Sequence, residues 1–208
     1  GATVVWPDVA YYSGITSYGG EKKKKVPAST ALETGIVVAS KDGHRFKREV
    51  DGNRYELEMF GYVTGSSDDS NLFFSSVKAV AALGGRLVLP KNGTLYIDAT
   101  VTSSKFIPEG IKEIDGNGGT IYMINPTNNE IWLADATSDL EIHHLTIRPG
   151  EGVARRGGIF GRGGSRIHIH HCDILSLKKN KNKRDKTKKR ISFGEDINLS
   201  ELFETIQR

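Results

Sequence analysis

Residues 138–149 read Ser-Asp-Leu-Glu-Ile-His-His-Leu-Thr-Ile-Arg-Pro, and residues 165–176 repeat the pattern as Ser-Arg-Ile-His-Ile-His-His-Cys-Asp-Ile-Leu-Ser. The offset is 27 residues, counted from Ser138 to Ser165. In each copy apolar and polar residues alternate, the alternation stops at a His-His pair, and it then resumes. This pattern predicts two short strands joined by a tight corner. A fixed repeat of this length indicates stacked units, and a stack with one turn of strands per repeat is a parallel β-helix.

The repeat also predicts which residues are neighbours in successive turns of the chain. Parallel strands lie about 4.8 Å apart, so equivalent residues form ladders along the stack. The predicted pairs are Leu140 with Ile167, Ile142 with Ile169, His143 with His170, His144 with His171, and Ile147 with Ile174.

Composition favours β structure with frequent turns. The 208 residues include 24 Gly, and β-branched residues lie in short runs between Gly, Asn and Asp. No window approaches the roughly 18 apolar residues of a membrane span, so we expect no membrane insertion. The N-terminus has no signal-peptide pattern. Cys172 is the single cysteine, which excludes an intrachain disulfide.

The formal net charge of +4 comes from one segment of the chain. Residues 178–190 hold nine Lys or Arg against one Asp, whereas residues 191–208 are acidic and residues 1–177 are close to neutral. We expect the basic run to be solvated, and contact with a polyanion through phosphate groups is the alternative. Because no aromatic residue is interleaved for base stacking, nucleic acid is not the expected partner.

The first part of the chain predicts a small β segment. Residues 1–20 are expected to be an irregular or extended arm, and Glu21–Lys25 a solvated turn or linker. Asp42-Gly43 and Asp51-Gly52 separate β-prone runs, and Asp-Gly between such runs is a strong hairpin signal. Residues 35–60 therefore predict an antiparallel unit of three strands.

One amphipathic helix is predicted between residues 71 and 83, where apolar residues recur at helical spacing. Asp68, Asp69 or Ser70 would cap its start, and Gly84 would end it. Strands are then predicted at Arg86–Pro90 and Thr94–Asp98, and the coils continue through residues 99–106, 111–124 and 130–134, with a Gly-rich corner at 157–164.

This order of features resembles the entry signature of the pectate-lyase-like β-helix superfamily, and the form found in bacteriophage tailspikes fits best. The resemblance spans roughly residues 35–176 and is carried by Phe60-Gly61, Asp68-Asp69, the helix, Gly84-Gly85, Leu87–Pro90, Gly93 and Tyr96-Ile97. The usual Gly-Asp-Gly loop before the acidic pair is reduced here to Gly65-Ser66-Ser67.

The fold class that follows is all-β, a right-handed parallel β-helix of about three to five coils. A capping α-helix would cover its open N-terminal end, since repeat proteins need caps to stay soluble, and a small β-rich segment would precede it.

The chain is expected to have three parts. Residues 1–59 form an N-terminal arm and small β segment, a candidate virion-attachment region, and residues 60–177 form the capped parallel β-helix. Residues 178–208 form a basic linker and a candidate C-terminal helix. This last part is either a genuine tail or the truncated or frame-shifted end of a longer protein. Its Lys/Asn-rich run favours the second interpretation.

Histidines gather in the repeat. Five of the six His residues are His143, His144, His168, His170 and His171. Imidazole pairs bind Zn or Cu, so a metal site is one interpretation. We prefer a structural ladder, because His144 and His171 lie where the superfamily often has Asn at a left-handed corner, a conformation in which His is also enriched. No metal, no cofactor and no catalytic role is therefore assigned to these residues.

Other candidate residues have simpler interpretations. Glycan-cleaving enzymes use paired carboxylates about 5–9.5 Å apart, but Glu141 aligns with His168 and Asp173 with Thr146, so we expect exposed strand polarity at both. Asp68-Asp69 is expected to cap the helix. Further candidates are Tyr122 and Trp132 for stacking on sugars, with packing preferred, and Gly161–Gly164, a coil corner that lacks the phosphate-loop pattern.

The resemblance implies a phage tailspike or related receptor-binding virion protein. Such a protein engages bacterial surface polysaccharide, binds other virion tail proteins and forms a homotrimer. The alternatives are a secreted polysaccharide lyase or glycoside hydrolase of the same superfamily, and a non-enzymatic virion structural protein. The non-coil arm and the lack of a signal peptide favour the virion over an extracellular location. Whether the chain is an enzyme stays open, and its catalytic residues are unknown.

Overall fold

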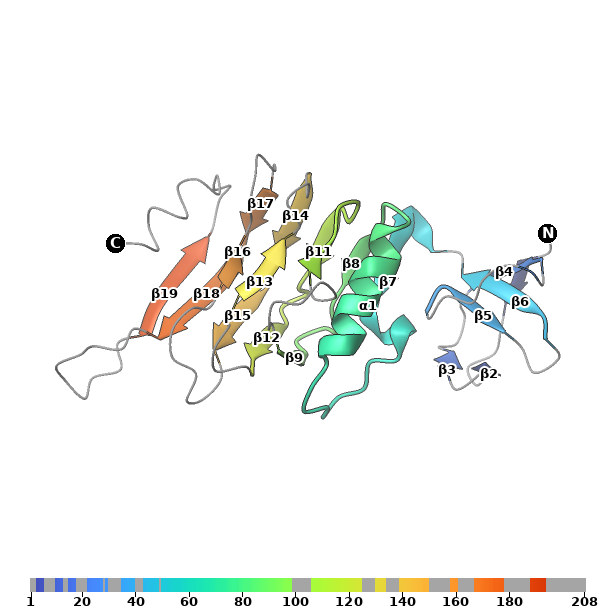
Figure 1. The fold of residues 1–208 in the computed structure, drawn as a ribbon, viewed down its shortest axis with the longest axis horizontal. Helices are drawn as coiled ribbons and strands as arrows, with labels where there is room; N and C mark the ends of the chain where they lie inside the picture. Colours follow the sequence, from blue (N-terminus) through green and yellow to red (C-terminus); the bar gives the residue numbers. More distant parts are fainter. Residues whose placement is uncertain are drawn as a thin grey trace.

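The structure is a computed structural model that describes residues 3–5, 10–12, 15–17, 22–27, 29, 35–39, 43–48, 50–98, 106–124, 130–133, 139–149, 158–160, 167–177 and 188–193. In these ranges the chain consists mostly of strands, many of them in parallel sheets, with one α-helix (Figure 1). No helix in this part of the protein is long and apolar enough to cross a membrane.

The N-terminal sheet is antiparallel and has the order β1-β4-β6-β5. Its strands are β1 (Thr3–Val5), β4 (Lys22–Val26), β5 (Val37–Ala39) and β6 (Arg45–Arg48), and a separate hairpin pairs β2 (Ala10–Tyr12) with β3 (Ile15–Ser17). The pairing of β5 with β6 confirms the predicted hairpin.

Two predictions for this region were wrong. The Lys run expected to be a solvated linker forms β4, which pairs with strands on both sides. The expected third strand of the unit leaves it, because β7 (Arg54–Glu56) pairs in parallel with β8 (Arg86–Val88). Two short 3-10 helices, η1 (Asp51–Asn53) and η2 (Leu57–Phe60), flank β7.

Three sheets form the rest of the described chain. Sheet I has the order β17-β14-β11-β8-β7, sheet II β19-β18-β15-β12-β9, and sheet III β10-β13-β16. The further strands of sheet I are β11 (Glu113–Asp115), β14 (Leu140–His143) and β17 (Ile167–His170). Sheet II contains β9 (Thr94–Ile97), β12 (Thr120–Met123), β15 (Thr146–Pro149), β18 (Cys172–Leu177) and β19 (Lys188–Phe193). Sheet III contains β10 (Phe106–Ile107), β13 (Glu130–Leu133) and β16 (Gly158–Phe160).

The chain passes through these sheets in a repeating order. From β8 to β18 it enters sheet I, then sheet II, then sheet III, and begins again. Every pairing among these strands is parallel, and only β19 joins antiparallel, against β18. Figure 1 shows the strands of each sheet following one another along the long axis of the molecule.

The predicted register of the repeat is confirmed. In sheet I, Leu140, Ile142 and His143 pair with Ile167, Ile169 and His170, and in sheet II Ile147 pairs with Ile174. The corner between the sheets is short, since only His144 and Leu145 separate His143 from Thr146.

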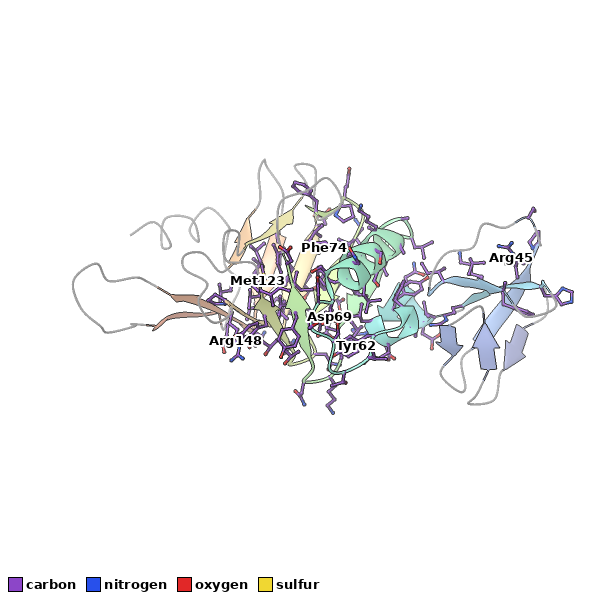
Figure 2. All side chains as sticks on the ribbon, turned by 60° about the horizontal axis from the view of Figure 1, so that its bottom comes forward. Arg45, Tyr62, Asp69, Phe74, Met123 and Arg148 are labelled. Carbon is purple, nitrogen blue, oxygen red and sulfur yellow. The ribbon has the colours of Figure 1, made fainter. Side chains whose placement is uncertain are left out.

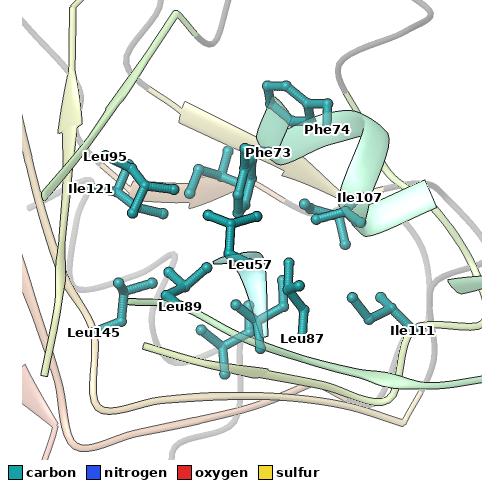
Figure 3. Packing of buried hydrophobic residues seen from close by; sticks show 14 of the residues in the cluster. Leu57, Phe73, Phe74, Leu87, Leu89, Leu95, Ile107, Ile111, Ile121 and Leu145 are labelled. Atoms are coloured by element: carbon teal, nitrogen blue, oxygen red, sulfur yellow. The ribbon is translucent and has the colours of Figure 1, made fainter. Parts of the chain in front are cut away.

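Apolar ladders fill the space between the sheets. Sheet I contributes Leu87, Ile114, Ile142 and Ile169, and sheet II contributes Leu95, Ile121, Ile147 and Ile174, all of them buried. In sheet III, Ile131 pairs with Ile159, and Ile107, which pairs with Leu133, lies on the same buried face. Burial of each such side chain stabilises the fold by about 1.5–3 kcal/mol. The helix α1 (Ser70–Ala81) packs on this core: Figure 3 shows Phe73 next to Leu57, with Leu95 on one side and Ile107 on the other.

The prediction that Gly84 ends α1 is confirmed, whereas the expected capping by Asp69 at its start is not observed. Gly84, with φ of 60°, donates its amide to Ala81 O, and Gly85 donates to Val80 O, which is the hydrogen-bond pattern of a Schellman motif. At the other end, Asp68 Oδ1 accepts the Ser70 amide at 2.9 Å, as a cap would. Asp69 makes no side-chain cap.

Asp69 instead connects the helix to sheet II. Its Oδ2 accepts the Tyr96 amide at 2.9 Å and its own amide donates to Tyr96 O at 2.7 Å. Asp69 is 4% exposed and lies where α1 meets β9 (Figure 2). The carboxylate therefore pairs with a strand amide that would otherwise have no partner on this side.

The corners between sheets I and II use left-handed residues. Asn92, Asn117, His144 and His171 have φ of 53°, 51°, 51° and 51°. The prediction that both His residues stand at left-handed corners, where Asn also fits, is confirmed.

The remaining predictions concern segments of the chain that the structure describes only in part. The Gly-rich segment at 157–164 was expected to be a corner, but residues 158–160 form β16. Residues 188–193 form β19, so the basic run ends in a strand. The candidate C-terminal helix, expected to start near Asp196 or Ser200, lies outside the described residues. Residues 99–105, 161–164, 178–187 and 194–208 lie outside the described part.

Candidate functional site

Polar side chains form two ladders across the outer face of sheet I. Because side chains alternate along a strand, the inward ladder of Leu87, Ile114, Ile142 and Ile169 leaves their neighbours on the opposite face. The register places Arg54, Arg86, Glu113, Glu141 and His168 in the first row, and Glu56, Val88, Asp115, His143 and His170 in the second.

Two carboxylates on β11 are the centre of this face. Glu113 and Asp115 are only 7% and 8% exposed. Arg54 contacts both, with its NH1 3.2 Å from Glu113 Oε1 and its NH2 bonded to Asp115 Oδ2. Arg86 NH1 lies 3.5 Å from Glu113 Oε2. Buried carboxylates need such partners, so the two guanidinium groups fix both acids in place.

The histidines continue this network onto the next strands. His143 Nε2 lies 3.3 Å from Glu113 Oε1, and His170 Nε2 lies 2.8 Å from Glu141 Oε1. The hydrogen bond from His170 is the main reason why the pKa of the Glu141 carboxyl lies below its ordinary value. Glu113 and Glu141 thus each orient the imidazole on the next strand of sheet I.

The four repeat histidines stack as predicted. The rings of His143 and His170 are 5.0 Å apart and 13° from parallel, and those of His144 and His171 are 5.0 Å apart and 5° from parallel. Within each coil the two Nδ1 atoms face each other at 2.7 Å. The predicted pairing of the histidine rings between successive strands is therefore confirmed.

A groove of about 570 Å³ crosses the first row of side chains. Its lining residues are Arg86, Lys112, Glu113, Asp139, Leu140, Glu141, His168 and His170. This volume is within the usual range of ligand sites. Seven of these eight residues are polar, so the groove offers hydrogen-bond donors and acceptors of both charges rather than an apolar slot.

The predicted site residues fall into separate places. Glu141 and His168 line the groove, but Asp173 lies on β18 of sheet II, opposite Thr146. Tyr122 is also on sheet II, where its ring lies 5.4 Å from that of Tyr96 at an angle of 56°. The Arg148 guanidinium lies 4.8 Å from the Tyr122 ring centre. Arg148 is exposed (Figure 2). The Trp132 side chain and Gly161–Gly164 are outside the described part.

Sequence reasoning missed Arg54, Arg86, Glu113 and Asp115, and it also missed Lys112 and Asp139 in the lining of the groove. A signal was available for the two acids, since Glu113-Ile114-Asp115 aligns with Glu141-Ile142-His143 at an offset of 28 residues. The two arginines become neighbours of the acids only through the parallel pairing of β7, β8 and β11.

Comparison with known proteins found no matching family model, no matching curated protein and no matching solved structure.

Proposed function

We propose that residues 60–177 form a right-handed parallel β-helix and that the protein is a receptor-binding virion protein of the phage tailspike type, which engages bacterial surface polysaccharide. The repeated order of sheets I, II and III supports the coil. The right hand follows from the strong preference of parallel crossover connections for that hand. Residues 1–59 would attach the protein to other tail proteins of the particle.

The groove on sheet I is the observation that carries the binding proposal. Its side chains come from successive strands that lie about 4.8 Å apart, so donors and acceptors recur along the stack. A polysaccharide presents hydroxyl groups that recur along a chain, and both charged donors and carboxylate acceptors bind hydroxyls. A polymer lying along the stack would meet Arg86, Glu113, Glu141 and His168 in order.

A glycan-cleaving enzyme is the second candidate, and one observation favours it. Glu113 and Glu141 are direct neighbours in register, and Asp115 follows two residues after Glu113 on the same face. Glycoside hydrolysis needs two carboxyl groups about 5–9.5 Å apart. Neighbouring and alternate positions of a sheet are separated by about 5–7 Å at the backbone, so this face has the acids that such a reaction needs.

Glycan-array binding followed by a reducing-end assay tests both candidates. We expect saturable binding to a capsular or O-antigen polysaccharide, at least ~10-fold weaker in Arg86→Ala and His168→Ala, because each loses a polar groove contact worth about 1.5 kcal/mol or more. Arg148→Ala on sheet II is the matched control and should bind like the parent.

The two assays separate the candidates. New reducing ends would identify the enzyme, and binding without cleavage would identify the receptor-binding protein. Absence of binding to every polysaccharide tested, or equal weakening in Arg148→Ala, would reject the groove as the binding site and favour a structural virion protein.

A further inference from the structure

The second row of sheet I ends in a group of metal-ligating atoms that the glycan groove does not use. Asp115, His143 and His144 each offer one ligand atom, and these atoms lie within 4.8 Å of one another. His143 Nδ1 is 2.7 Å from His144 Nδ1 and 3.5 Å from Asp115 Oδ1. Three nitrogen and oxygen donors therefore converge on one point at the corner between β14 and β15.

Neighbouring groups hold the side chains of His143 and Asp115 in place. Glu113 Oε1 lies 3.3 Å from His143 Nε2, an arrangement that favours the imidazole proton on Nε2 and makes Nδ1 an acceptor, which meets His144 Nδ1 at 2.7 Å. Asp115 is held from two sides, since Oδ2 pairs with Arg54 and Oδ1 accepts the Asn117 amide at 2.8 Å. Carboxylate and imidazole thus reach the site already oriented.

A hydrogen-bond donor or a cation would satisfy one contact in this group. With its proton on Nε2, His143 presents an acceptor at Nδ1, and a carboxylate is acceptor only. These two atoms face each other at 3.5 Å, longer than a hydrogen bond. A cation between them would be attracted by both.

We propose that Asp115 Oδ1, His143 Nδ1 and His144 Nδ1 bind one divalent transition-metal ion of the Zn²⁺ class. Two imidazoles and one carboxylate are a typical Zn²⁺ donor set that leaves further positions for water or a ligand. With Zn–N bonds of about 2.0–2.1 Å, two nitrogens of a tetrahedral site stand ~3.3 Å apart. Metal binding would replace the 2.7 Å contact between the two Nδ1 atoms and would move the exposed His144 ring outward by about 0.6 Å. The proposal does not depend on glycan binding.

The repeat supplies an internal control for this site. His170 and His171 have the same Nδ1 to Nδ1 distance of 2.7 Å. Asp115 on β11 lies opposite His143 on β14. The residue on β14 that lies opposite His170 is His143, which has no carboxylate. The second pair therefore has no carboxylate ligand, and we expect it to bind the ion far more weakly.

Zinc titration of the metal-free full chain tests the proposal, by calorimetry with ZnCl₂ and by visible absorption with Co²⁺. We compare His144→Asn with His171→Asn, because Asn fits a left-handed corner, as Asn92 and Asn117 do. Thermal melts without metal verify that both variants are folded. Glu113→Gln tests the outer partner, whose loss typically costs ~10–100-fold in affinity.

The expected result is one Zn²⁺ per chain, with wild-type affinity in His171→Asn, an affinity at least ~10-fold lower in Glu113→Gln and a larger loss in His144→Asn. Absence of stoichiometric Zn²⁺ binding by the folded chain overturns the proposal. So does equal weakening by His144→Asn and His171→Asn, or two equivalent ions per chain, because either result would make Asp115 unnecessary.

Discussion

At the scale of single residues, the corner histidines combine a backbone role with a side-chain role. His144 and His171 both have φ of 51°, and their rings stack 5.0 Å apart. In the two preceding turns, where the corner is longer, Asn92 and Asn117 have the left-handed conformation. The corner therefore needs a residue that tolerates the left-handed region, which Asn and His both do. His additionally provides a ring that stacks on the next corner.

Replacing His171 by Val should destabilise the fold, because a β-branched residue at positive φ is strained, at a cost of about 1–2 kcal/mol. His171→Asn should remain within about 0.5 kcal/mol of the parent, as surface substitutions without strain do. Urea unfolding of both variants measures the difference. Equal midpoints for Val and Asn would show that the corner does not impose the left-handed conformation.

Cys172 should be unreactive in the native protein. Its side chain is 2% exposed, and burial raises the pKa of the thiol to about 11. At pH 8 the folded protein should therefore react with a disulfide reagent only after denaturant is added, because the thiolate is the reactive form. The native thiol keeps its proton above pH 9, where an unfolded thiol loses it, so stability should fall between about pH 9 and 11. Rapid labelling at pH 8 without denaturant would contradict this.

At the scale of elements, Asp69 attaches α1 to sheet II rather than capping the helix. Asp69→Ala removes the acceptor of the Tyr96 amide, and an unpaired buried amide costs about 1–3 kcal/mol. We expect lower stability together with faster hydrogen exchange at Tyr96. Asp68→Ala is the control, since it removes only the Ser70 contact and should leave exchange at Tyr96 unchanged. Protection of Tyr96 in Asp69→Ala would disprove the assigned role.

Local patterns were enough to predict α1, β8 and β9, because their signals lie within each segment. The strand β4 was missed because five residues dominated by Lys look solvated, while the β-structure comes from partners on β1 and β6. The parallel partner of β7 was missed for a related reason, since hairpin signals describe only neighbouring segments. The register of sheet I was predictable where the repeat is visible and hidden at β11, where the offset changes to 28.

The site was predictable only in part, for the same physical reason. His143, His144, His170 and His171 belong to the visible repeat, so their stacking followed from the strand spacing. The buried acids Glu113 and Asp115 lie on either side of Ile114, and the arginine that pairs with both of them is distant in sequence. Their partner Arg54 lies on β7, and no local rule connects β7 with β11.

At the scale of the whole molecule, the tailspike proposal implies a homotrimer. Among the described residues, Val63 is the large apolar side chain that stands out as exposed, at 69%. A trimer formed by the described surfaces would therefore have a polar interface. Size-exclusion chromatography with light scattering should give three times the chain mass. A clean monomer at all concentrations would count heavily against the tailspike proposal.

Because the repeat is 27 residues long, the length of the molecule depends on how many repeats its gene encodes. In the proposed β-helix each coil would contact only the coils on either side, so an added unit would disturb no distant contact. An in-frame duplication of residues 140–166 would insert one more rung with its own Glu141, His143 and His144 equivalents. The groove would lengthen by about 4.8 Å without a new fold. If the groove binds polysaccharide as proposed, unequal recombination within this repeat would yield proteins that differ in the length of polymer they bind.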